Sequence, residues 1–295
     1  MSKFILSGFA DEIDPYLNKQ MDVLDTLDIR YIEIRCADGK NISKVTEAEA
    51  EEMHSRLAAR GYRISSIGSP IGKIKVTDDF EPHLALFQNC IRMAQIFEAP
   101  YIRMFSFYPP EGEDIAKYRD TVMKRWEAFL KLAEGTGVTL LHENEKDIYG
   151  DVAERCLDLA ETLGIGLIFD PANFIQSGVT TYPDAFELLR KHIRYLHIKD
   201  AKMGSGQVVP AGYGDAGLAK ILAELDAQGF EGFLSLEPHL GTFHGFADLE
   251  PASKTNLMEE GGPKCYTIAA ESLRKVLASL GIQPEKTAEK SWTRA

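Results

Sequence analysis

The chain has 295 residues, 44% of them hydrophobic and 26% charged, which is the composition of an ordinary globular protein and excludes collagen-like, coiled-coil and disordered classes. Asp and Glu outnumber Lys and Arg by 45 to 33, and the net charge of −12 disfavours nucleic acid and anionic lipid as partners. The four cysteines are widely spaced and form no CxxC pair, so neither a zinc knuckle nor a disulfide framework is indicated. We expect no signal peptide and no membrane-spanning segment, and therefore a cytoplasmic protein.

Eight short apolar runs, rich in β-branched and aromatic residues, alternate with helical patterns. In chain order they are Phe4–Gly8, Arg30–Arg35, Arg63–Gly68, Tyr101–Phe105, Val138–Glu143, Gly166–Asp170, Arg194–Lys199 and Phe233–Glu237. They recur about every 33 residues, which suits a strand, a helix and two loops. Eight such units predict an α/β fold with a single (β/α)8 TIM barrel over residues 1–282, followed by a polar tail over residues 283–295.

Short signals mark where helices begin and end. Asp14 before Pro15 predicts a helix start, because the carboxylate can cap the helix and proline is tolerated at its first position. Thr46 and Glu49 have the spacing of a capping box, and Gly61 is placed to end that helix.

Three loops that follow predicted strands are longer than the others. They cover residues 106–114, 200–216 and 238–263. In a parallel barrel these loops share the rim at the carboxyl ends of the strands, where barrel enzymes place their sites. The glycine-rich stretch 212–217 lacks the lysine of a P-loop and does not follow a strand directly, so we interpret it as a lid or turn. We expect neither NAD nor flavin.

Polar side chains end the last four predicted strands. They are Glu143, Asp170, His197 and Glu237, separated by 27, 27 and 40 residues. Taken singly, each could be a helix cap, a hydrogen-bonded core residue or a surface acid. Because each spacing is about one strand–helix unit, the four should instead converge on one part of the barrel mouth. Three carboxylates and one imidazole predict a site for one divalent metal ion, with Mn²⁺ as the first choice and Mg²⁺, Co²⁺ or Zn²⁺ as alternatives.

Other polar residues lie near the same predicted rim and are candidates to bind substrate. They are Asn173, Lys199, His239, Lys73 and Arg103. The last two have the charge to bind a phosphate or carboxylate, although a surface ion pair explains them equally well.

Two further residues are given supporting roles. Asp200 is a candidate to orient His197 by accepting its free ring N–H. His142 precedes Glu143 in the same strand, so alternation predicts that it points away from the barrel axis and is structural.

The segments around the four strand ends also resemble a known family. LLHEN at Glu143, FDPAN at Asp170, YLHIKDA at His197 and LSLEPH at Glu237 are similar to motifs of the xylose isomerase-like TIM barrel superfamily, in its sugar phosphate isomerase/epimerase branch. The resemblance extends over roughly residues 4–280, and SGFADEID and SSIGSPIGK are similar to a bacterial subgroup. It implies that the four residues hold one divalent cation, that Glu143 and Glu237 also form the acid/base pair, and that the protein is a homo-oligomer.

This sequence departs from the family pattern at two places. Asn173 stands where many ketose epimerases of the superfamily have a histidine. The arginine that commonly follows the histidine ligand is absent, and Lys199 and Lys202 are the nearest cations. Both departures concern substrate binding and leave the four metal ligands in place.

The predicted chemistry follows from this set of residues. A metal that chelates a carbonyl oxygen and the neighbouring hydroxyl acidifies the C–H bond between them and stabilises the resulting enediolate. If Glu143 and Glu237 lie on opposite sides of a sugar, one can remove the proton and the other can return it. We therefore predict a metal-dependent isomerase or epimerase of a small sugar, sugar phosphate or polyol. The hydride-shift variant normally needs a second metal, and the sequence offers no second obvious ligand cluster.

Three alternatives differ in measurable ways. A dehydratase of the inosose or dehydroshikimate type could use the same site and would show an enone absorbance. A DNA-repair endonuclease of the superfamily uses three zinc ions and many more histidines, whereas this chain has seven histidines and a charge of −12. A catalytically silent sugar-binding barrel would bind sugar without metal.

Overall fold

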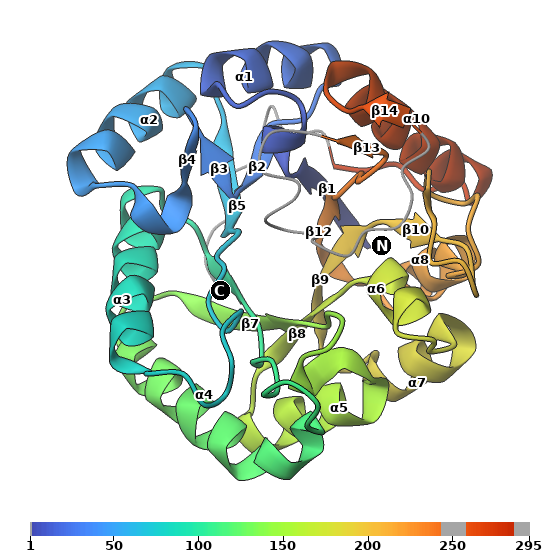
Figure 1. Cartoon of the computed structure of the whole chain (residues 1–295). Coiled ribbons are helices and arrows are strands. Elements are labelled where there is room, and N and C mark those ends of the chain that lie inside the picture. Colours follow the sequence, from blue (N-terminus) through green and yellow to red (C-terminus); the bar gives the residue numbers. More distant parts are fainter. Residues whose placement is uncertain (1, 243–257, 286–295) are drawn as a thin grey trace.

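The computed structural model describes residues 2–242 and 258–285. Eight parallel strands form one sheet in the order β1-β12-β9-β8-β7-β6-β5-β2. The end strands β1 and β2 lie against each other, so the sheet is a nearly closed barrel (Figure 1). The barrel strands are β1 (Lys3–Gly8), β2 (Tyr31–Ile34), β5 (Arg63–Ile67), β6 (Tyr101–Met104), β7 (Thr139–Glu143), β8 (Gly166–Phe169), β9 (Ile193–Ile198) and β12 (Glu231–Leu236). The predicted TIM barrel is confirmed, and each strand boundary agrees with its prediction to within two residues.

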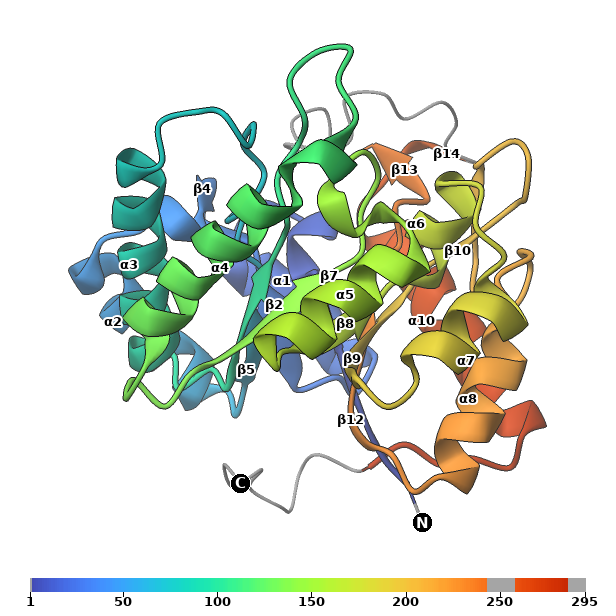
Figure 2. The same cartoon turned by 90° about the horizontal axis from the view of Figure 1, so that it is seen from below.

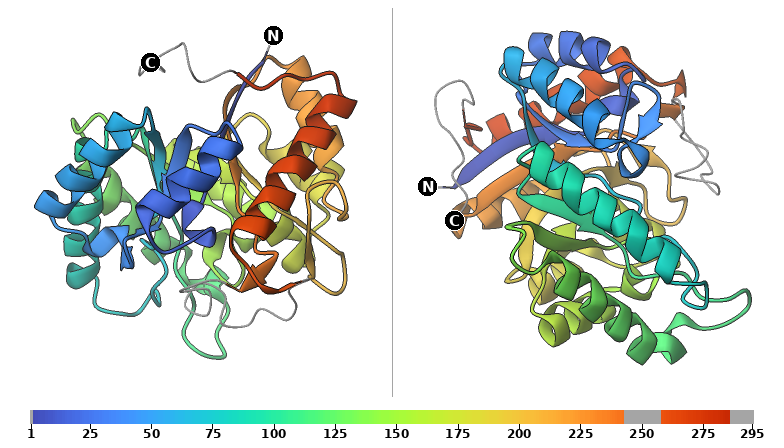
Figure 3. Two further views of the ribbon diagram at one scale, coloured as in Figure 1. Left: turned by 90° about the horizontal axis from the view of Figure 1, so that it is seen from above. Right: turned by 90° about the vertical axis from the view of Figure 1, so that its left-hand side faces the viewer.

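Helices surround the barrel (Figures 1 and 2). They are α1 (Leu17–Thr26), α2 (Glu47–Ala59), α3 (Glu81–Ile96), α4 (Arg119–Ala133), α5 (Ala153–Leu163), α6 (Pro171–Gln176), α7 (Phe186–Leu189), α8 (Leu218–Ala227) and α10 (Pro263–Ser279). Short strands β3 (Cys36–Ala37), β4 (Lys40–Asn41), β10 (Asp200–Ala201), β11 (Val208–Val209), β13 (Gly241–Thr242) and β14 (Met258–Glu260) lie in the connecting loops. Helix α10 packs beside α1, where the Arg274 side chain donates to the Leu27 carbonyl (Figure 3). The last helix thereby completes the outer ring next to the first. No helix within the described ranges is both long enough and apolar enough to span a membrane.

Helix boundaries follow local chemistry, with one correction. The Thr46 and Glu49 capping box is present at the start of α2, and Gly61 follows the helix with a φ of +73°. The predicted helix start at Asp14 and Pro15 is wrong, since α1 begins at Leu17. The Asp14 carboxylate accepts the Tyr16 N–H at 2.9 Å and forms a local turn instead.

The interior of the barrel is layered. Alternate residues of a strand face the same side, so positions two apart stack along the barrel axis. An apolar layer closes the interior below the site; it consists of Ile5, Tyr31, Leu141, Ile168, Tyr195 and Phe233. Two residues further along the same strands comes a polar layer, formed by Ser7, Glu33, Glu143, Asp170, His197 and Ser235, all buried. The apolar layer thus supports the polar layer from below and shields it from water on that side.

The carboxyl ends of the strands carry the long loops, as predicted. In Figure 2 the loop after β6 rises at the top, on the side of the strands' carboxyl ends, whereas the N-terminus, where β1 starts, lies at the bottom. The loop after β9 contains the β10–β11 hairpin. Much of the predicted loop 238–263 and of the predicted tail 283–295 lies outside the described residues.

Candidate metal and catalytic site

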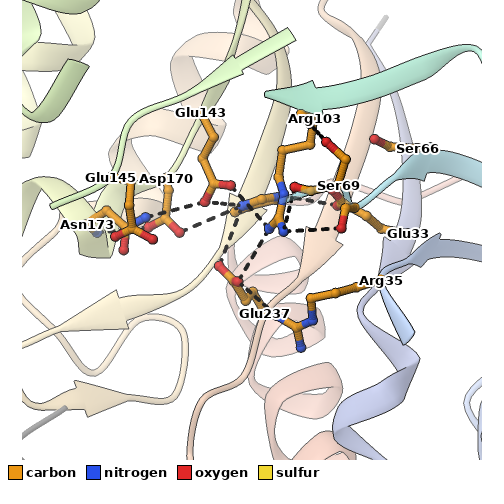
Figure 4. A network of polar contacts seen from close by, with 12 residues as sticks. Glu33, Arg35, Ser66, Ser69, Arg103, Glu143, Glu145, Asp170, Asn173 and Glu237 are labelled. Carbon is orange, nitrogen blue, oxygen red and sulfur yellow. Dashed lines mark hydrogen bonds and ion pairs between the residues drawn. The ribbon is translucent and has the colours of Figure 1, made fainter. Parts of the chain in front are cut away.

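Four side chains meet where β7, β8, β9 and β12 end (Figure 4). They are the predicted ligands Glu143, Asp170, His197 and Glu237, and one nitrogen or oxygen of each lies within 4.8 Å of those of the others. All four are buried, with at most 3% of any residue exposed. Neighbouring strands of the barrel therefore bring together side chains that are far apart in the sequence.

Asp170 is fixed by the start of helix α6. Its Oδ1 accepts the Asn173 N–H at 2.9 Å, which caps the helix, and Pro171 occupies the first turn. The side chain of Asn144 bonds both backbone groups of Asp170, donating to its oxygen at 2.9 Å and accepting from its nitrogen at 2.8 Å. Capping uses one carboxylate oxygen and leaves Oδ2 directed towards the other ligands.

The two ring nitrogens of His197 face different surroundings. Nδ1 lies 3.0 Å from Glu143 Oε1 and 3.5 Å from Glu237 Oε2, whereas Nε2 lies 3.1 Å from Glu33 Oε2 on the opposite side of the ring. Burial alone would lower the pKa of His197, but the carboxylates of Glu143 and Glu33 raise it well above its ordinary value. Nδ1 is therefore the nitrogen available to a metal.

Two basic side chains contact the carboxylates. The Lys199 ammonium lies 2.9 Å from Asp170 Oδ2 and 2.8 Å from Glu237 Oε2. Arg103 Nη1 lies 3.2 Å from Glu143 Oε2 and 3.9 Å from Glu237 Oε1, between the two glutamates. Burial by itself would raise the pKa of Glu237, but the Lys199 ammonium and neighbouring histidines lower it well below the ordinary range.

Two guanidinium groups pack on the Phe9 ring beside the site. The Arg35 and Arg103 guanidinium carbons lie 4.3 and 4.8 Å from the centre of its ring, and His197 packs against the same ring with its edge. Arg35 also bonds the Asp11 carboxylate at 2.8 Å. The aromatic ring and this ion pair hold the Arg35 guanidinium 3.5 Å from Glu237 Oε1.

Glu12 and His239 form a second buried pair at the rim. The His239 backbone N–H donates to Glu12 Oε2 at 2.8 Å, and its Nε2 lies 3.4 Å from Glu12 Oε1 and 3.5 Å from Glu237 Oε1. Burial raises the pKa of Glu12 to about 8, although Arg35 opposes this shift. Burial lowers the pKa of His239 well below its ordinary value.

Glu145 holds two lysines further out. Its carboxylate lies 2.9 Å from the Lys73 ammonium and 2.8 Å from that of Lys146, and Lys73 also packs on the Phe105 ring. Burial would raise the pKa of Glu145, but Lys146 and Lys73 lower it well below the ordinary range. Lys73 is thus a neighbour of the site and does not contact the four ligands in the described structure.

The donor set fits a divalent metal ion. Within the described ranges, Glu143 Oε2 and Asp170 Oδ2 are buried oxygens that accept no hydrogen bond, although a basic side chain lies near each. Burial raises the pKa of Asp170, and the Glu237 and Glu143 carboxylates add to this rise, although the Lys199 ammonium opposes it. A hard cation would satisfy both oxygens, and three carboxylates with one imidazole are ligands that such ions accept.

The structure also corrects one supporting role. The suggestion that Asp200 orients His197 is wrong, because its carboxylate accepts backbone N–H groups of its own loop. His142 points away from the axis as predicted and contacts Ser106 at 2.9 Å and the Trp126 ring. The remaining substrate candidate, Asn173, donates its side-chain N–H to Glu143 Oε1 at 3.3 Å.

Several residues that line the site are not among those predicted from the sequence. They are Asp11, Glu12, Glu33, Arg35 and Glu145. A signal for Glu33 was present, since a single acidic residue inside an apolar strand is the pattern that identified the ligands on the later strands. The others lie just beyond strand ends, where polarity is common and carries little information.

The protein is a TIM barrel, and four residues at the carboxyl ends of its strands form a cluster that could hold a metal ion. Residues 21–260 match the family described as xylose isomerase-like TIM barrel, and the chain belongs to this family. No curated protein matches the sequence significantly.

Solved structures share the fold at low sequence identity. A xylose isomerase domain protein from Planctomyces limnophilus is 18% identical, with a TM-score of 0.69 over 95% of this chain and 98% of that chain. An L-ribulose 3-epimerase is 17% identical, with a TM-score of 0.70 over 95% and 96%. The probable 3-DHS dehydratase AsbF from Bacillus anthracis is 15% identical, with a TM-score of 0.65 over 93% and 99%. Similar folds also occur in a Mycobacterium smegmatis protein in complex with magnesium and in the IOLI protein with a zinc atom.

Proposed function

We propose that this protein is a divalent-metal-dependent isomerase or epimerase of a small sugar or polyol, acting by proton transfer. The observation that carries the proposal is the pairing of Glu143 and Glu237 across one buried ligand cluster, with the Arg103 guanidinium between them. When bound, Mn²⁺ or a similar ion would polarise a carbonyl group and acidify the neighbouring C–H bond.

The residues of the chain then have separate tasks. Glu143 and Glu237 come from β7 and β12, with two strands between them, so they can approach a substrate from two sides. One carboxylate accepts the proton and the other returns it, to the opposite face or to the adjacent carbon. Arg103 and Lys199 lie beside these carboxylates and can bind the substrate oxygens, with Asn173 and His239 at the rim.

The test is a panel of ketoses, aldoses and inososes incubated with the Mn²⁺-loaded protein in D₂O. Proton transfer predicts product with deuterium at the reacting carbon, measured by NMR. Product without deuterium would instead indicate a hydride shift. Glu143→Gln and Glu237→Gln are expected to lower kcat by 10²-fold or more, as for loss of a general acid or base.

The same assay distinguishes a dehydratase from an isomerase or epimerase. Loss of water from an inosose would produce an enone absorbance, and loss of water from dehydroshikimate would produce the absorbance of an aromatic catechol, in either case with no epimer. Sugar binding by calorimetry without turnover, and without dependence on metal, would contradict both enzyme proposals.

A further inference from the structure

Glu33 is a buried carboxylate that the proposed chemistry does not use. It lies in β2, is fully buried, and is absent from the group of four possible ligands. It stands on the apolar layer of the barrel, two residues after Tyr31 in the same strand, and its carboxylate lies against the His197 ring. An ionised carboxylate in such a place is costly unless specific partners compensate for the lost water.

In the part of the chain that the structure describes, both hydrogen-bond partners of Glu33 act on one oxygen, Oε2, while Oε1 has none. Oε2 lies 3.1 Å from His197 Nε2 and accepts the Ser235 hydroxyl at 2.7 Å. Ser235 and His197 are paired residues of adjacent strands, so both donors approach from the β9–β12 side of the barrel. This arrangement fixes the Glu33 carboxylate against the edge of the imidazole.

The other nitrogen of His197 faces the ligand cluster. Nδ1 lies within 3.8 Å of oxygens from Glu143, Asp170 and Glu237. A metal can bind Nδ1 only when this nitrogen carries no proton, and the neutral ring must then carry its proton on Nε2. A carboxylate acceptor at Nε2 favours that tautomer and holds the ring in the orientation that binds metal.

We propose that Glu33 is a positioning residue that accepts the Nε2–H of His197 and thereby directs Nδ1 towards the divalent metal. The proposal rests on the metal site of the proposed function. It assigns to strand β2 the role that the sequence suggested for Asp200.

The first test measures Mn²⁺ affinity of the whole chain by calorimetry. Glu33→Gln preserves the size of the side chain, removes the charge and is expected to weaken Mn²⁺ binding by about 10- to 100-fold. Ser235→Ala is the matched control, because it removes the second hydrogen bond to Glu33 Oε2 and leaves the contact with His197; we expect a change of less than about threefold.

A double-mutant cycle separates positioning from simple charge attraction. In a His197→Gln background, Glu33→Gln should weaken Mn²⁺ binding little further, because there is no imidazole to orient. An equal loss in both backgrounds would mean that Glu33 acts only as a negative charge and would overturn the proposal. Equal affinity of the wild type and Glu33→Gln would overturn it as well.

NMR of the Zn²⁺-loaded wild type gives a readout that does not depend on any variant folding. The proposal predicts a protected N–H on Nε2 of His197 in this protein, identified by its coupling pattern. A proton on Nδ1 with Zn²⁺ bound through Nε2 would refute it. If the wild type binds neither ion, the proposed function itself fails; if it binds both and only the Glu33 results disagree, the metal site remains.

Discussion

The buried ring of His142 makes the stability of the protein depend on pH. The residue is fully buried on the outer side of β7, and its Nε2 lies 2.9 Å from Ser106 Oγ. Packing is tight, since a Cβ added at Gly150 would lie 2.2 Å from the ring. Burial lowers the pKa of His142 from its ordinary value of 6.5 to about 3. The folded protein therefore keeps this ring neutral at pH values where the unfolded chain protonates it.

The sign and size of the effect follow from linkage. A folded pKa below the unfolded pKa means that the unfolded chain binds more protons between pH 6.5 and about 3, so stability is lost as the pH falls through that range. At about 1.4 kcal/mol per pH unit, lowering the pH from 7.5 to 4.5 removes about 2.7 kcal/mol of unfolding free energy through this residue.

Urea unfolding of the wild type and His142→Leu at the two pH values measures this contribution. The acidic groups titrate in both proteins, so the difference between the proteins isolates His142. We expect the stability advantage of the wild type to shrink by about 2.7 kcal/mol at pH 4.5. His192→Gln is the control for removing a histidine elsewhere. Parallel losses in the wild type and His142→Leu would refute the reasoning.

Two substitutions, each compared with a control substitution, test the loops that frame the site by urea unfolding. Gly72 has a φ of +96° and its added Cβ would lie 2.2 Å from the Phe105 carbonyl oxygen, whereas Gly112 has a φ of +76° with nothing within 4 Å. Gly72→Ala should therefore cost about 2 to 4 kcal/mol and Gly112→Ala about 1 kcal/mol; equal costs would mean that the Phe105 backbone yields. Asp200→Asn should cost about 2 kcal/mol, because the carboxylate accepts N–H groups from residues 201, 212, 214 and 216. Asp215→Asn weakens one hydrogen bond, which the Asp215 carboxylate accepts from the Met203 N–H, so it should lower the unfolding free energy less. A larger loss in Asp215→Asn than in Asp200→Asn would contradict this reasoning.

The barrel could be predicted from the sequence because the apolar strand runs are clear and recur at the regular interval of one strand–helix unit. Strand runs that end at or next to Glu143, Asp170 and His197 follow one another at intervals of one strand–helix unit, and a parallel barrel places such residues at one rim. The start of α1 was misplaced because Asp14 can serve either a helix cap or a local turn, and the short 3₁₀ turn Ala10–Glu12 that precedes it leaves no pattern.

The site was predictable where a polar residue interrupts an apolar strand. Contacts between distant strands could not be predicted from the sequence. They depend on which inward-facing residues lie at the same height along the barrel axis. The partner of His197 Nε2 is Glu33, 164 residues away in the chain, and no local pattern shows that Glu33 rather than Asp200 contacts this nitrogen. Side chains beyond strand ends, such as Arg35, acquire their roles only when the loops pack.

The most direct test of the account is the metal content of protein purified without chelator, measured by mass spectrometry. The variants His197→Ala and Glu237→Gln each remove one ligand of the cluster, and His192→Gln serves as a folded control. We expect about one divalent transition metal per chain in the wild type and the control, and its loss in both ligand variants. A wild type that remains free of metal after reconstitution with Mn²⁺, or ligand variants that retain it, would contradict the account.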